Sequence, residues 1–461
     1  MVVHRGGGTH RVTATPRIAL LGHVGNGNLG DETIVAAVVA RLRAAAPGVE
    51  LTAFTSNPPD TAARHGVPAF PIRPLSAARG PEPQADGPRA WTARAADRVR
   101  RIRWLKALLR PAALVVRAAI GVGRELRFDV QSYRRLRRVR VVVFTGSAQL
   151  SDDVGGPFAY PLTVLRWSVL ARLRGAAVSI ASMGAGPADT RLGRLFLRLA
   201  LRLAAHRSFR DPTSLAVARG LGAPEPNLLV RDLALSHPRL AASALPARAA
   251  RTPCVGINPL SIYGGANWQL HDRAPYDAYV EAHAVAARGL VEQGWRVVLF
   301  GTQIVMDPEP IRDVVERLRS LAPDAARAVE TATGISEVTG LLELIEGFDL
   351  AVATRYHGVL LALASGVPTV AVAYHPKTRD LMEHFGLGAW CLAIEGLSGS
   401  ALLERVKRLA SDLPSVRAAL AERRGRDLAE LLVQYDHLLC LAGTAAASSG
   451  LPTPQPALQL F

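Results

Sequence analysis

Cysteine is scarce in this chain, which contains only three cysteines among 461 residues. Cys254, Cys391 and Cys440 lie far apart and form no C-x-x-C pair, which argues against a disulfide framework and against a cysteine-based zinc site. Two other short pairs, His375-x-Lys377 and Asp307-x-Glu309, offer too few ligands for a metal ion. We therefore predict a protein of a reducing compartment with no metal site.

Long uncharged apolar runs are also missing. The first sixteen residues lack the apolar core of a secretion signal. The nearest candidate for a bilayer span, residues 359–374, carries Gly-Val-Pro in its middle, a pattern typical of a helix, a turn and a strand. We expect a cytoplasmic protein, either free or held peripherally at the inner face of the membrane.

Acidic residues are fewer than basic ones, and the basic excess is concentrated in one segment. Residues 76–140 hold seventeen Lys and Arg against five acids, which is +12 of the chain's net charge of +17. Such a segment can bind nucleic acid, but its aromatic residues are thinly spread and no nucleic-acid motif is evident. A basic nucleic-acid-binding protein is therefore the least favoured alternative, and nucleic acid is not an expected partner.

Part of this basic segment, residues 94–123, has an amphipathic helical pattern. Its leucines, isoleucines, valines and Trp104 alternate with arginines, and Pro111 ends or kinks the helix. A basic amphipathic helix fits attachment to an anionic membrane surface. An apolar stripe also fits packing on the protein's own first domain, so both interpretations stay open.

The chain alternates strand and helix patterns in two successive blocks, which is typical of α/β proteins with parallel sheets. We predict an α/β fold with two doubly wound Rossmann-like domains facing a cleft. The expected organisation is a flexible N-terminus (1–16), an N-terminal domain (17–245) with a basic helical insertion (74–138), a C-terminal domain with its C-terminal helices (252–445) and a disordered tail (446–461). Ligands should lie at the carboxyl ends of the strands.

A glycine-rich loop, "GHVGNGNLGDET" (22–33), follows the first predicted strand. Gly25, Gly27 and Gly30 have the spacing of a dinucleotide-binding turn, but no acid ends the second strand to bind a ribose. Carboxylates at the start of the next helix would repel a pyrophosphate. Asp31 is either the N-cap of that helix or an exposed carboxylate that binds a polyol.

Four segments together resemble the polysaccharide pyruvyl transferase family. They are "GNGNLGDETI" (25–34), "SMGAGP" (182–187), "FRDPTSLAVARGLG" (209–222) and "DLAVATRYHGVLLALASGVPTVAVAYHPK" (349–377). The likeness covers residues 17–75 and 140–390 in order. The chain departs from the family at Gly146-Ser147-Ala148, where three glycines are usual, and at Tyr356 and Gly358, where Leu and Ala are usual.

The resemblance implies a fold like that of GT-B glycosyltransferases and transfer of a pyruvyl group from phosphoenolpyruvate to a sugar, commonly as a cyclic ketal. It implies a sugar or lipid-linked glycan acceptor for cell-envelope polysaccharide, with no cofactor besides the donor substrate. An anionic donor needs several cations close together. Arg210, Arg355 and Lys377 follow predicted strands and are the expected donor-binding residues.

We expect His357 to act as general acid or phosphate ligand, because imidazole can donate a proton near neutral pH. Asp31 is expected to position or deprotonate the acceptor, with Asn28 and Gly30 beside it in acceptor binding. The alternative function is a GT-B glycosyltransferase that uses a nucleotide sugar. It requires an acid in the C-terminal domain for the ribose or base, and Glu337, Glu343 and Glu346 are the candidates.

Overall fold

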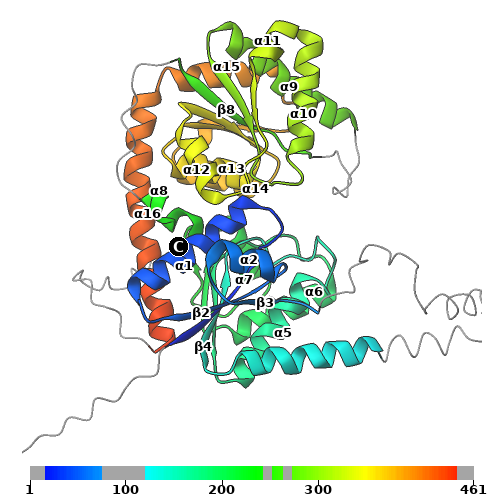
Figure 1. The fold of residues 1–461 in the computed structure, drawn as a ribbon, viewed down its shortest axis with the longest axis vertical. Helices are drawn as coiled ribbons and strands as arrows, with labels where there is room; N and C mark the ends of the chain where they lie inside the picture. Colours follow the sequence, from blue (N-terminus) through cyan, green and yellow to red (C-terminus); the bar gives the residue numbers. More distant parts are fainter. Residues whose placement is uncertain (1–15, 75–119, 242–251, 263–272, 444–461) are drawn as a thin grey trace, which may run out of the picture.

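The computed structural model describes residues 16–74, 120–241, 252–262 and 273–443. The predicted flexible N-terminus, the disordered tail and most of residues 94–123 lie outside the described residues, so those predictions stay untested. Described helices and strands form two lobes stacked along the long axis of the molecule (Figure 1).

The first lobe is built on a parallel sheet of seven strands in the order β3-β2-β1-β4-β5-β6-β7. Its strands are β1 (Arg17–Leu21), β2 (Glu50–Thr55), β3 (Ala69–Pro71), β4 (Val139–Thr145), β5 (Ala177–Met183), β6 (His206–Phe209) and β7 (Leu228–Leu229). The long strands are continuous Val-, Ile- and Ala-rich runs, as expected for a sheet that helices cover on both faces.

The second lobe is built on a parallel sheet of six strands in the order β10-β9-β8-β11-β12-β13. Its strands are β8 (Cys254–Asn258), β9 (Arg296–Phe300), β10 (Glu330–Ala332), β11 (Leu350–Ala353), β12 (Thr369–Ala373) and β13 (Cys391–Ala393). In each sheet the chain moves outward from its first strand and then returns to that strand's other side. The predicted pair of doubly wound α/β sheets is therefore confirmed.

Helices cover both faces of each sheet. In the first lobe they are α1 (Leu29–Ala45), α2 (Pro58–His65), a helix over 120–135, α5 (Tyr160–Leu173), α6 (Arg191–Leu203) and α7 (Pro212–Gly220). The short 3-10 helix η1 (Leu233–Ser236) and α8 (Pro238–Ala241) follow. In the second lobe they are α9 (Arg273–Glu292), α10 (Pro308–Leu321), α11 (Pro323–Ala328), α12 (Val338–Glu346), α13 (Tyr356–Ala364), α14 (Pro376–His384), η2 (Gly388–Trp390) and α15 (Gly399–Ala410).

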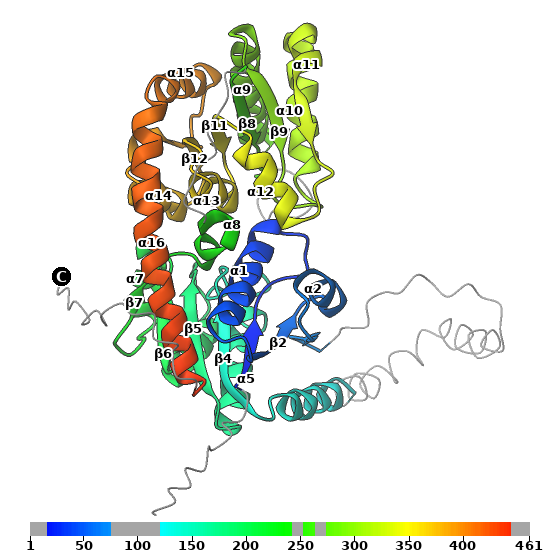
Figure 2. The same ribbon diagram turned by 60° about the vertical axis from the view of Figure 1, so that its left-hand side comes forward.

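The last helix, α16 (Leu413–Leu441), runs along both lobes (Figures 1 and 2). Near its start Arg417 donates to the backbone carbonyl of Asp349 in the second lobe. Near its end Gln434 donates to the Ser182 hydroxyl at 3.0 Å, and the Tyr435 hydroxyl lies 2.8 Å from that of Ser236. This helix, expected as part of the C-terminal domain, therefore also packs on the first sheet.

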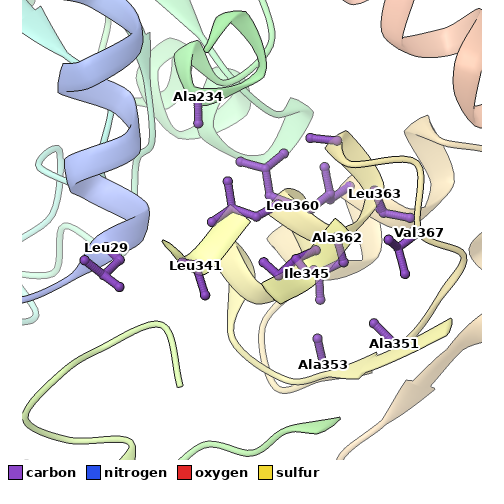
Figure 3. Packing of buried hydrophobic residues seen from close by; sticks show 14 of the residues in the cluster. Leu29, Ala234, Leu341, Ile345, Ala351, Ala353, Leu360, Ala362, Leu363 and Val367 are labelled. Atoms are coloured by element: carbon purple, nitrogen blue, oxygen red, sulfur yellow. The ribbon is translucent and has the colours of Figure 1, made fainter. Parts of the chain in front are cut away.

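One hydrophobic core is continuous across the two lobes. Buried Leu29 of α1 and Ala234 of η1 belong to the same cluster as Leu341 of α12 and Leu360 of α13. Figure 3 shows these side chains between the elements of the two lobes. Apolar burial of this kind stabilises one relative placement of the lobes. Among the described residues, no helix is both long and apolar enough to cross a bilayer.

Candidate functional site

The expected site lies where the strand order reverses in each sheet. In the first sheet this point is between β1 and β4, and in the second it is between β8 and β11. Ligands of open α/β sheets bind at the carboxyl ends of strands at such points. The predicted site residues are carried by the loops and helix starts that follow strands β1, β6, β11 and β12.

The glycine-rich loop after β1 pairs with the second lobe through its backbone. Leu29 N–H donates to the carbonyl of Thr302 at 2.8 Å, and Ile304 N–H donates to that of Gly27 at 2.8 Å. The side-chain amide of Gln303 donates to the Asn26 carbonyl at 3.0 Å. Because these groups are engaged by the second lobe, the loop holds the two lobes together rather than cradling a pyrophosphate.

The start of α1 corrects both interpretations of Asp31. The N-cap is Asn28, whose side-chain oxygen accepts from Gly30 N–H at 3.1 Å, so Asp31 is not the cap. Nor is Asp31 exposed, because only 5% of its surface is accessible. Its carboxylate accepts from the side-chain amide of Asn28 at 2.8 Å. Burial raises the pKa of Asp31 to about 7, against the opposing effect of Arg210.

Glu32, the neighbouring acid, supports the loop. Its carboxylate accepts from Gly25 N–H at 2.7 Å and lies 2.7 Å from Nε2 of the buried His65 on α2. Glu32 therefore fixes the conformation of the glycine-rich loop. Asp31 lies within the electrostatic reach of the predicted donor residue Arg210.

Gly30 and His357 meet across the two lobes. A Cβ atom placed on Gly30 would lie 2.1 Å from Cγ and 2.3 Å from Cβ of His357. The imidazole therefore lies directly against the backbone of α1, on the face where any other residue would carry a side chain. The expected acceptor-binding role of Gly30 stays a prediction, and the described contact supplies a separate reason for a glycine.

His357 is buried in the first turn of α13. Burial lowers its pKa to about 4; Asp232 opposes the shift, and Arg210 and Arg355 add to it. The imidazole is therefore neutral near pH 7 in the free protein. Its Nε2 atom is buried and makes no hydrogen bond with the described residues. A buried polar atom without a partner is costly, so this nitrogen is available to a ligand.

Arg355 precedes His357 at the N-cap position of α13 and forms an ion pair with the fully buried Asp307. The same carboxylate accepts from the backbone N–H groups of Thr302 and Gln303, at 2.7 and 2.9 Å. Burial raises the pKa of Asp307, and Arg355 opposes that rise. Arg355 is thus oriented by the loop that also pairs with the glycine-rich loop.

Arg210 lies between the lobes and is buried. Its guanidinium donates to Asp232 at 2.8 Å and stacks 4.1 Å from the centre of the Tyr356 ring on α13. Gly184 leaves space for this guanidinium, since a Cβ there would lie 2.9 Å from it. Burial lowers the pKa of Arg210, but Tyr356, Asp232 and other acids outweigh it and raise the pKa above its usual value.

Lys377 is buried near the start of α14. His375 is the N-cap residue of this helix, and its side chain accepts from the backbone N–H of Lys377 at 3.2 Å. Burial lowers the pKa of Lys377 to about 8; Arg210 adds to the shift, and Asp211, Asp153 and Asp380 oppose it. Within the described part of the chain, its ammonium forms no hydrogen bond or ion pair. Arg210 therefore interacts electrostatically with Asp31, His357 and Lys377, and Arg355 also interacts with His357.

Sequence reasoning missed a polar group on the first lobe beside Asp31. Tyr160 at the start of α5 hydrogen-bonds to the imidazole of His23, and the Arg73 guanidinium lies 4.7 Å from its ring centre. Burial raises the pKa of Tyr160 to about 12, and Asp31 and Asp153 contribute. These residues come from three distant segments with no shared motif, so only the tertiary structure brings them together.

Ser147 is the second missed residue, and a departure in its sequence pattern could have pointed to it. Its φ of 61° lies in the left-handed region, as does that of Gly146 at 50°. Such backbone favours glycine, which is the usual residue there in the resembled family. The side chain of Ser147 instead interacts with Asp31 and opposes the rise in its pKa.

The acids expected to bind a nucleotide ribose are engaged elsewhere. Glu337 pairs with Arg64 at 3.1 Å. Glu343 and Glu346 pair with Arg239 at 3.0 and 2.6 Å. All three acids are therefore paired with arginines other than Arg210 and Arg355, which weakens the argument for a nucleotide sugar donor.

The fold resembles those of enzymes that act on sugars. A UDP-N-acetylglucosamine 2-epimerase superposes with a TM-score of 0.55 at 11% identity, covering 93% of this chain and 96% of the other. The corresponding enzyme from Methanocaldococcus jannaschii gives 0.50 at 10% identity over 85% and 91% of the two chains. A glycosyltransferase from Rickettsia africae gives 0.52 at 10% identity over 93% and 99%. At such identities the likeness establishes a GT-B-like two-domain fold.

The family follows from the sequence itself. Residues 28–376 match the model of the family described as polysaccharide pyruvyl transferase, from the N-cap of α1 to the first residue of α14. The chain therefore belongs to the polysaccharide pyruvyl transferase family, as the four motifs predict, and the family implies transferase activity.

Proposed function

We propose that this protein transfers the pyruvyl group of phosphoenolpyruvate to a sugar of a cell-surface polysaccharide or glycolipid, as a ketal. The observation that carries the proposal is the set of cationic groups around the unpaired Nε2 of His357. Arg210 and Arg355 both lower the pKa of His357, and Arg210 also lowers that of Lys377. This mutual repulsion means that the free site would be stabilised by a small polyanion.

Phosphoenolpyruvate fits this requirement because a phosphate and a carboxylate lie on one small skeleton. Lys377 binds one anionic group through its ammonium, while Arg355 and the N–H groups at the start of α13 bind the other. Arg210, paired to Asp232 and stacked on Tyr356, provides fixed positive charge behind them. No cofactor or metal is part of the proposed reaction.

The bound polyanion raises the pKa of His357, so that the imidazole can carry the proton it donates. That proton adds to C3 of the enol and leaves C2 electrophilic. One sugar hydroxyl forms a C–O bond to C2 and loses its proton, while the C–O bond to phosphate breaks. A second hydroxyl adds to the same carbon and closes the ketal, and the released protons pass to Asp31 and to the phosphate.

Asp31 suits the acceptor side because its pKa is about 7 in the free protein. A carboxylate with that pKa can both accept and return a proton near neutral pH. Tyr160 and Asp153 on the same lobe are further groups for sugar hydroxyls. Asn28 and Gly30 stay proposed acceptor contacts, although Asn28 already holds Asp31 and Gly30 lies against His357.

Mass spectrometry of candidate glycan acceptors incubated with phosphoenolpyruvate tests the proposal. The expected result is addition of a pyruvyl group with release of one phosphate per group transferred. Parallel binding titrations with UDP-, GDP- and ADP-sugars test the alternative of a nucleotide-sugar glycosyltransferase. Saturable binding of one of these, with none of phosphoenolpyruvate, would reject the proposal. Because phosphoenolpyruvate is made in the cytoplasm, we propose that the reaction takes place there.

A further inference from the structure

Large apolar side chains are exposed mainly on one helical layer of the first lobe. Of the fifteen large hydrophobic residues that are exposed in the described structure, eleven fall between residues 120 and 199. They are Ile120, Val122, Leu126, Val130, Val154, Phe158, Val169, Leu173, Leu192, Leu195 and Leu199. An exposed apolar surface of this kind indicates an interaction site.

These residues share a layer because three helices cover the same face of the first sheet. Phe128 from the helix over 120–135, Trp167 from α5 and Leu197 from α6 all belong to one core cluster under that layer. Arg166 of α5 pairs with Glu125 at 2.6 Å and so fixes the helix over 120–135 beside it. Figure 1 shows the three elements together on one side of the lower lobe.

Helix α6 shows most clearly how the outer face is arranged. Its buried residues include Gly193, Leu197, Ala200 and Leu201. Leu192, Leu195 and Leu199, spaced three and four residues apart, fall on the opposite side and are 45%, 48% and 38% exposed. A stripe that faces away from the core is not explained by packing within the described chain.

The charge of this layer selects its partner. Helices α5 and α6 carry six arginines and no acid. Four of them, Arg191, Arg194, Arg198 and Arg202, are exposed on α6, and none forms an ion pair with another described residue. A second copy of this face would meet it with like charge. The segment 75–119 is itself basic by sequence and would also be repelled.

We propose that this face, defined by the exposed residues of α5, α6 and the helix over 120–135, docks the protein on an anionic membrane surface. Leucines enter the boundary between head groups and acyl chains while the flanking arginines contact anionic head groups. Nucleic acid would use the arginines but leave the leucines in water. This inference goes beyond the proposed function, because it concerns the surface to which the whole protein binds and not the reaction that it catalyses.

The same face begins beside the candidate site, so docking would bring the site close to the lipid surface. Backbone N–H groups of Asp189 and Thr190, at the start of α6, donate to Asp152 at 2.9 Å each. Asp153 follows and electrostatically affects both Lys377 and Tyr160. Val154 and Phe158 are exposed on the intervening loop. An acceptor carried on a lipid would therefore reach the site from this edge.

Flotation of the full-length protein with vesicles tests the proposal. We expect binding to vesicles that contain phosphatidylglycerol, little binding to phosphatidylcholine alone, and weakening as salt is raised. Replacing Leu192, Leu195 and Leu199 together by glutamine, which keeps helix propensity, should lower the partition coefficient roughly tenfold or more. Replacing Arg194, Arg198 and Arg202 together by glutamine should also lower the partition coefficient at low salt. This second variant keeps the test valid if the leucine variant misfolds.

The matched control changes exposed apolar residues elsewhere, Leu432→Gln and Val433→Gln on α16, and should float like the wild type. Equal flotation of the wild type and both α6 variants would overturn the proposal. Loss of binding only when residues 94–119 are deleted would assign the contact to that segment instead. Duplex DNA that displaces the protein from vesicles, with binding unaffected by the leucine changes, would indicate a nucleic-acid site. Calorimetry with phosphoenolpyruvate should be unchanged in every α6 variant.

Discussion

Substitution of Gly30 by alanine tests how the two lobes build the site. Gly30 lies inside helix α1, so alanine by itself should favour the helix by up to about 1 kcal/mol. The added methyl would instead lie 2.1 Å from Cγ of His357. Ordinary contact requires about 3.4 Å or more, so the ring and the helix must separate by more than about 1 Å.

Rotation of the imidazole cannot relieve this clash. The new methyl would also lie 2.3 Å from Cβ of His357, and that atom does not move when χ1 changes. The backbone of α13 must therefore shift against α1, where Leu29 and Thr302 hold the lobes together. Overpacking of this kind costs ~1–3 kcal/mol of unfolding free energy, more than the gain in helix propensity. Displacement of a catalytic group by ~1 Å can lower the rate about a hundredfold.

Urea unfolding and pyruvyl transfer should both be measured, with Gly425→Ala as the matched control. Gly425 lies in helix α16 with no neighbour within 4 Å of an added Cβ, so that variant should be as stable as the wild type or more so. In a His357→Gly background, which removes the clashing atoms, Gly30→Ala should no longer destabilise the protein. A Gly30→Ala variant with wild-type stability and rate would refute the described contact.

Four further predictions concern the ionisable groups of the site. The pKa of Lys377 is lowered to about 8, so phosphoenolpyruvate affinity should fall as pH rises through 8; Lys377→Arg should remove that dependence in calorimetric titrations. The pKa of Asp31 is raised to about 7, so its contribution to stability is present at low pH and lost as pH rises toward 7. The melting temperature of Asp31→Asn minus that of the wild type should therefore increase from pH 4 to 7. The variant should also form less product while its affinity for phosphoenolpyruvate is unchanged. A loss of that affinity would contradict the assignment of Asp31 to the acceptor. Arg355→Ala should weaken donor binding at least about tenfold and, by leaving Asp307 buried and unpaired, lower stability by ~3–5 kcal/mol. His357→Gln should abolish turnover while donor binding stays within a few-fold; wild-type rates would place the chemistry elsewhere.

Local sequence patterns determined the scaffold of this protein. Period and composition were sufficient for the long strands, because a strand buried on both faces is a continuous apolar run wherever it lies. Strands of two or three residues, such as β7 and β13, were not predicted because they are too short to carry a periodic signal.

The motif residues could also be selected from the sequence, since helix starts and strand ends are fixed locally. Their partners could not. Three pairings depend on contacts between segments separated in the chain or on competing polar groups: Asn28 caps α1, Asp307 holds Arg355, and Asp232 holds Arg210. Burial is the largest cause of the unusual pKa values of Asp31, His357 and Lys377, and desolvation is set by the residues that pack around a side chain.

For the glycine-rich loop, the sequence determined the local conformation, and the tertiary structure determined what packs against it. Its spacing established a tight turn before a helix, and the acids after it argued against a pyrophosphate. Which surface would lie against Gly30 was not encoded in any neighbouring residue. The imidazole of His357, more than 300 residues away in the chain, fills that place because a continuous apolar core sets the two lobes against each other.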